Sequence, residues 1–75
     1  MGKTETTPTE IIRMISAEAT RLIGPWPSNL DIFVFRVDDS WECLITPTNN
    51  PTEAKFRDVA LQIGLSLERS FKLRV

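Results

Sequence analysis

Two similar motifs, Thr7-Pro8-Thr9-Glu10 and Asn50-Pro51-Thr52-Glu53, constrain the fold of this chain more than any other feature of the sequence. The first residue of each motif can accept a hydrogen bond from a free N–H at a helix start, and the proline suits the first helical position. The glutamate three residues after the cap completes the pattern of a capping box. The motifs therefore predict one helix near each end of the chain and leave the segment between them for strands.

The first helix is expected from Pro8 to about Ile23. Its apolar residues recur at helical spacing and form one face, which we assign to the core: Ile11, Ile12, Ile15, Ala19, Leu22 and Ile23. Gly24 and Pro25 then end the helix, because glycine tolerates the left-handed geometry of a helix end and proline cannot continue the helix. Residues 1–6 have no apolar side chain after Met1, so we expect a disordered N-terminal tail.

The middle of the chain predicts a β-hairpin, with strands from Asp31 to Val37 and from Trp41 to Thr46. A three-residue loop, Asp38-Asp39-Ser40, would create one wholly apolar face, with Val37 opposite Trp41, Phe35 opposite Cys43 and Phe33 opposite Ile45. A two-residue loop would bring charged side chains onto both faces. We therefore expect the three-residue loop, although its last position favours glycine and here holds serine.

The end of the second helix can be placed in two ways. Gly64 could cap it and release residues 71–75 as a third strand, but apolar residues keep one helical phase through Gly64 as far as Phe71. We therefore expect a helix from Pro51 to about Ser70. The predicted fold is α+β, a two-layer α-β-β-α arrangement in which two helices cover one face of the hairpin. The alternative is α-β-β-α-β with a short C-terminal strand. Residues 7–71 would form one domain, followed by a tail over 72–75.

The sequence argues against catalysis. It contains no histidine, and Cys43 is its only cysteine, so neither a common general base nor a cysteine-rich metal site is present. Asp31, Asp38 and Asp39 are explained by turns, and Cys43 is expected to fill the core with a raised pKa. We predict a protein that is not an enzyme and that needs no metal or cofactor.

The cysteine count and the hydropathy pattern also bear on location. Small secreted domains usually carry several disulfides, whereas this chain can form none internally. Its longest apolar run, Ile32 to Phe35, is far too short to span a membrane. We therefore expect a soluble cytoplasmic protein without a membrane partner.

Nucleic acid is a less favoured partner. Basic residues gather in the last third of the chain, and Arg69, Lys72 and Arg74 would carry such contacts. The net charge is nevertheless −1, and acidic residues are interleaved with the basic ones. We retain an accessory nucleic-acid-binding protein only as the alternative function.

The remaining apolar residues suggest a partner surface. A chain of 75 residues holds one small core, so self-association is a plausible source of further stability. The residues expected outside the core lie on the outer hairpin face, on the second helix and in the linker: Ile32, Val34, Leu44, Leu61, Leu65 and Trp26. The leading hypothesis is a small non-enzymatic protein-interaction module, which binds another protein or a second copy of itself as a homodimer.

Overall fold

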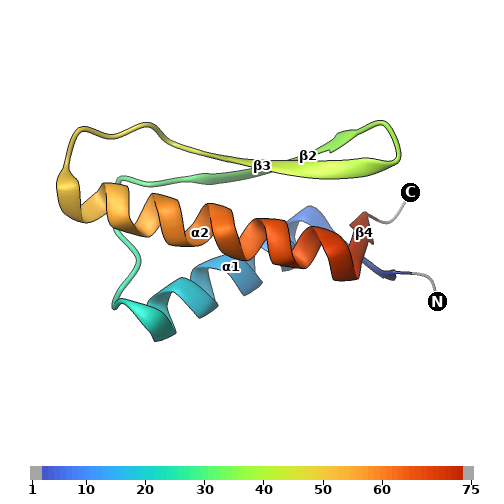
Figure 1. Ribbon diagram of the computed structural model, residues 1–75, viewed down its shortest axis with the longest axis horizontal. Helices are drawn as coiled ribbons and strands as arrows, with labels where there is room; N and C mark the ends of the chain where they lie inside the picture. The colour runs from blue at the N-terminus through green and yellow to red at the C-terminus, as the bar shows by residue number, and fades with distance from the viewer. Residues whose placement is uncertain (1–2, 74–75) are drawn as a thin grey trace.

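The computed structural model describes residues 3–73 and has the predicted α+β fold. The hairpin lies on one side of the two helices, with β2 packed on α1 and β3 packed on α2, while the helices also pack against each other (Figure 1). The elements in chain order are β1 (Thr4–Thr6), α1 (Pro8–Leu22), β2 (Ile32–Val37), β3 (Ser40–Ile45), α2 (Pro51–Ser70) and β4 (Phe71–Leu73).

Both helices begin at the motifs that predicted them. Thr7 Oγ1 accepts a hydrogen bond from the backbone N–H of Glu10 at 3.2 Å. Asn50 Oδ1 accepts from the N–H groups of Thr52 and Glu53, at 2.8 and 3.2 Å. Just after the end of α1, Gly24 has a φ of 148°, a backbone conformation that residues other than glycine rarely adopt. Local sequence therefore accounts for where each helix starts and where α1 stops.

The helix α2 runs through Gly64 to Ser70, as the apolar phase predicted. Gly64 has a packing reason to be glycine, because an added Cβ would lie 2.6 Å from the Cys43 sulfur on β3. The chain then becomes extended, so the short C-terminal strand of the alternative prediction is also present, after the long helix rather than in place of its second half.

The prediction of tails at both ends is wrong for Thr4–Thr6 and for Lys72 and Leu73. These residues belong to β1 and β4, which pair in parallel with Thr4 opposite Phe71 and Thr6 opposite Leu73. Thr6 is buried, and Leu73 packs against the core. Neither strand is stable alone, and each exists because α1 and α2 bring the two ends together. Residues 1, 2, 74 and 75 lie outside the described residues.

The predicted hairpin register is also wrong. The loop contains only Asp38 and Asp39, and Val37 pairs with Ser40, Phe35 with Glu42 and Ile32 with Ile45. Asp38 has a φ of 52°, which aspartate tolerates better than most residues, whereas the three-residue loop would have required serine at its left-handed position. The shift by one residue exchanges the two faces of β2.

The core lies between the hairpin and the helices. Trp41 is 1% exposed, and its indole Nε1 donates a hydrogen bond to the Phe71 carbonyl at 3.0 Å, which ties the hairpin to β4. The buried apolar residues come from both helices, both hairpin strands and the linker: Ile11, Ile15, Ala19, Leu30, Ile32, Trp41, Ile45, Phe56 and Ala60.

Candidate interaction surface

The hairpin face that points away from the helices carries three large apolar side chains. Phe33 is 54% exposed, Phe35 37% and Leu44 56%. Phe33 and Leu44 are direct cross-strand partners, and Phe35 follows Phe33 on the same face. Glu42, also exposed, lies opposite Phe35. We call Phe33, Phe35, Glu42 and Leu44 the outer hairpin surface.

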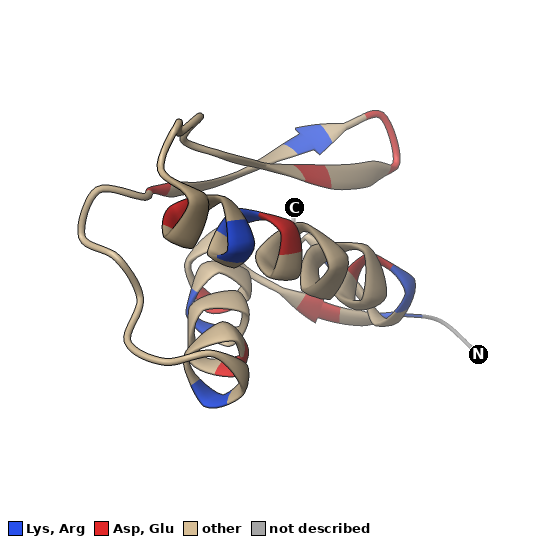
Figure 2. Ribbon diagram, turned by 60° about the vertical axis from the view of Figure 1, so that its left-hand side comes forward, with Lys and Arg blue, Asp and Glu red and all other residues tan. Residues whose placement is uncertain are grey.

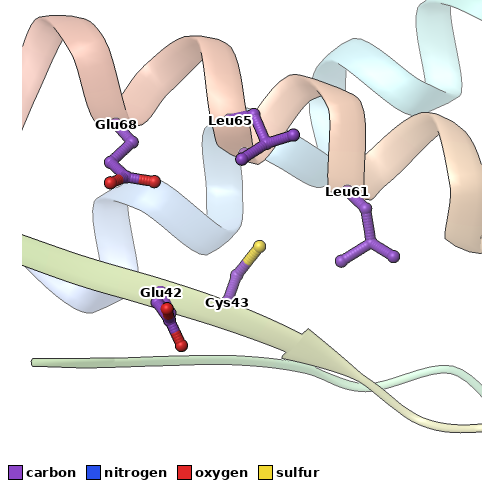
Figure 3. A pocket seen from close by; sticks show the side chains of 6 residues that line it. Glu42, Cys43, Leu61, Leu65 and Glu68 are labelled. Carbon is purple, nitrogen blue, oxygen red and sulfur yellow. The ribbon is translucent and has the colours of Figure 1, made fainter. Parts of the chain in front are cut away.

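Strand alternation positions this surface. Ile32, Trp41 and Ile45 point to the core and are at most 8% exposed, so their neighbours along each strand must point outward. Figure 3 shows the alternation on β3, where Cys43 points toward α2 and Glu42 points to the opposite side of the strand. The pairing of β2 with β3 therefore determines on which face of the hairpin the two aromatic side chains lie.

The predicted partner residues do not lie together. Ile32 is buried, and Val34 is half-buried and packs against the core, because the register places both on the inner face. Trp26 belongs to the core as well. Its ring meets Phe56 edge-on at 5.8 Å between centroids, and its Nε1 donates to the Leu30 carbonyl at 2.8 Å. Leu44 is the one predicted hairpin residue that lies on the outer hairpin surface.

Phe33 and Phe35 were missed because the register prediction assigned them to the core. The sequence does contain one signal for the observed register, the pair Asp38-Asp39, since aspartate is suited to a two-residue loop that needs a positive φ. The prediction instead favoured the register that makes one face of the hairpin wholly apolar, and that register is wrong.

Leu61 and Leu65 lie in a different place, in a pocket of about 300 Å³ between β3 and α2. Figure 3 shows Leu61 extending from α2 toward the strand, with Leu65 and then Glu68 farther along the helix. Leu65 is 57% exposed. The pocket is lined by Glu42, Cys43, Leu61, Gly64, Leu65 and Glu68, and Glu42 thus borders both the pocket and the outer hairpin surface.

Cys43 is half-buried at this pocket. Burial raises the pKa of its thiol, and the negative charges of Glu68 and Glu42 raise that pKa further. A thiol reacts through its thiolate, so Cys43 is a poor nucleophile near neutral pH. The arrangement supports a packing role and provides no activated group.

A second apolar groove, of about 580 Å³, lies between the two helices. Leu22, one of its apolar lining residues, is 55% exposed. Glu18 at its border binds Arg21 of the same helix, and this hydrogen bond lowers the pKa of the Glu18 carboxyl. The remaining lining residues are Met14, Ala17, Ile63, Ser66 and Leu67.

Within residues 3–73, the basic residues are interspersed with acidic ones. Figure 2 shows basic and acidic positions alternating along the helices. Arg69 is exposed at the end of α2, whereas Lys72 Nζ lies 3.9 Å from a Glu5 carboxylate oxygen. Lys72 and Arg36 share a pocket near the hairpin loop with three acidic residues, Glu5, Asp38 and Asp39. Such a mixture is unfavourable for phosphate, and the predicted contact Arg74 lies outside the described residues.

Within residues 3–73, no group of three or more acidic, cysteine or histidine side chains is placed to hold a metal ion. None of the described helices combines the length and apolar character needed to cross a membrane.

Comparison of the chain with protein families, with curated proteins and with solved structures finds no match in any of the three. The geometry described above is therefore the basis for assigning a function.

Proposed function

We propose that this protein is a non-enzymatic interaction module that binds another protein chain through the outer hairpin surface. The observation that supports this function is the exposure of Phe33, Phe35 and Leu44 side by side on paired strands. Full burial of one such side chain contributes about 1.5–3 kcal/mol. Adjacent exposed apolar residues of this size are typical of interaction sites, whereas isolated ones are common on any surface.

The same surface suits recognition because it is preorganised. The two aromatic rings are carried by a ladder whose inner face is anchored by Trp41 and Ile45, so binding would order little of the backbone. Aromatic residues also dominate the binding energy of many protein interfaces. A second copy of the chain and a different protein are both compatible with this role, and we propose that the module acts in the cytoplasm, where a lone cysteine stays reduced.

The test compares the purified chain with Phe33→Asp and Leu44→Asp, with Gln62→Asp on the exposed side of α2 as the control. Each variant is used as bait in cells, every retained partner is purified, and its affinity is measured by calorimetry. Light scattering reports self-association. We expect the two outer-surface variants to weaken association at least about tenfold, a loss of about 1.4 kcal/mol. The control should retain binding, and circular dichroism should be unchanged in all three.

Association that survives both Phe33→Asp and Leu44→Asp would contradict the proposed function. The same is true if Gln62→Asp weakens association as much as they do, because the loss would then reflect added charge rather than this surface.

A further inference from the structure

The outer hairpin surface carries charge of one sign. Glu42 lies among its apolar residues, opposite Phe35. Asp31 precedes β2 at one end of the hairpin, and the exposed loop residues Asp38 and Asp39 lie at the other. Figure 2 shows the acidic loop and the acidic position on β3. Within residues 31–46, an apolar face is therefore bordered by carboxylates at both ends and has one near its centre.

The basic residue of the hairpin does not offset this charge. Arg36 pairs with Trp41, which places it on the inner side of the sheet, and its guanidinium donates to the Leu73 carbonyl at 3.4 Å. Arg36 is the sole Lys or Arg within residues 31–46. A partner that covers Phe33, Phe35 and Leu44 would thus remove the Glu42 carboxylate from water, and no lysine or arginine of residues 31–46 lies on that face to pair with it.

The free-energy cost of burying the Glu42 carboxylate differs between a second copy of the chain and a partner that carries a basic residue. A carboxylate buried without a counter-charge is strongly unfavourable, and two of them brought together are worse. In a symmetric dimer each copy presents the same patch, so stacking two outer hairpin surfaces would place both Glu42 side chains and both acidic borders in one interface. A partner with a lysine or arginine among apolar residues would pair with Glu42 and bury the same apolar area.

We propose that the outer hairpin surface binds a basic, apolar segment of a different protein, and that Glu42 selects this partner against a second copy of the chain. This inference rests on the proposed function, since it specifies the partner of the same surface.

The experiment uses two synthetic probes. One is a hexapeptide that alternates lysine with valine or phenylalanine, and the other has glutamate in place of each lysine. Each is titrated into the isotope-labelled full chain at low salt and followed by amide chemical shifts. We expect the lysine peptide to shift the amides of Phe33, Phe35 and Leu44 and to bind at least about tenfold more tightly than the glutamate peptide.

Two variants with equal changes in net charge isolate the role of Glu42. Glu42→Gln should remove most of the preference for the lysine peptide. Asp58→Asn, which neutralises an exposed carboxylate on α2, should keep it. Light scattering should also show a monomer for the native chain and a greater average mass for Glu42→Gln, because the repulsion between stacked copies is reduced.

Equal affinity for the two peptides, or equal losses in the two charge variants, would overturn the inference. A native dimer that Phe33→Asp dissociates would overturn it too, but would leave the proposed function intact. If Phe33→Asp changes neither peptide binding nor self-association, the proposed function itself fails.

Discussion

At the scale of single residues, the Gly64 backbone on α2 lies so close to the Cys43 side chain on β3 that an added Cβ would clash with it. We expect Gly64→Ala to lower the free energy of unfolding, because its methyl group would lie 2.6 Å from the Cys43 sulfur and would force that side chain to move. Alanine is otherwise the better helix former by about 1 kcal/mol. When Cys43→Ala removes the sulfur, Gly64→Ala should therefore raise the free energy of unfolding instead of lowering it. Urea unfolding of the two single variants and the double variant measures this coupling, and additive effects would contradict it.

The raised pKa of Cys43 also makes the free energy of unfolding depend on pH. Its pKa is raised in the folded state, so the folded chain keeps the thiol protonated where the unfolded chain has begun to ionise. This contribution to stability is complete below the pKa of an unfolded cysteine, about 8.5, and is lost as the pH rises toward the folded pKa. Between about pH 7 and about pH 10, the native chain should lose more stability than Cys43→Ala. Parallel pH profiles for the two proteins would count against this prediction.

At the scale of secondary-structure elements, the two-residue loop determines which hairpin residues are exposed. Asp38 has a φ of 52°, where a β-branched residue is disfavoured by roughly 1–2 kcal/mol and glycine has no penalty. We expect Asp38→Val to lower the free energy of unfolding by about that amount and Asp38→Gly to raise it slightly. Asp39→Val is the control at the next position. Thermal unfolding measures all three, and the loop assignment is wrong if Asp38→Val is as stable as the native chain.

At the scale of the whole molecule, β1 and β4 join the two ends of the chain beside the core. Removing residues 1–6 should lower the free energy of unfolding by about 1–3 kcal/mol, since the parallel ladder is lost and the buried Thr6 is removed. Leu73→Ser should weaken the same pairing from the other side. Because both changes disrupt one contact, their combined effect should be smaller than the sum. Calorimetry of the two variants and their combination tests this, and full additivity would show that the strands do not stabilise each other.

The whole molecule also explains why an apolar surface remains exposed. A two-stranded sheet has two faces, and both helices pack on the same one. Nothing within residues 3–73 covers Phe33 and Leu44, which remain 54% and 56% exposed. The candidate interaction surface is thus a consequence of having two helices and one hairpin in a single small chain.

The helices were predictable from sequence because their determinants are local. Thr7 and Asn50 cap backbone groups within three residues, and the apolar phase that carries α2 through Gly64 is a property of that segment alone. The α+β class and the two-layer arrangement follow from the same signals together with the short β-prone segment between the helices.

Tertiary structure decided the register, the terminal strands and hence the candidate site. Pairing Phe35 with Glu42 is unfavourable by local pattern, but it turns Ile32 and Val34 to the core and lets Asp38 take the strained position in the loop. β1 and β4 require residues from opposite ends of the chain to meet. Local sequence determines where each helix begins and where α1 ends, whereas the face that a strand exposes depends on which register gives the lowest free energy for the whole core.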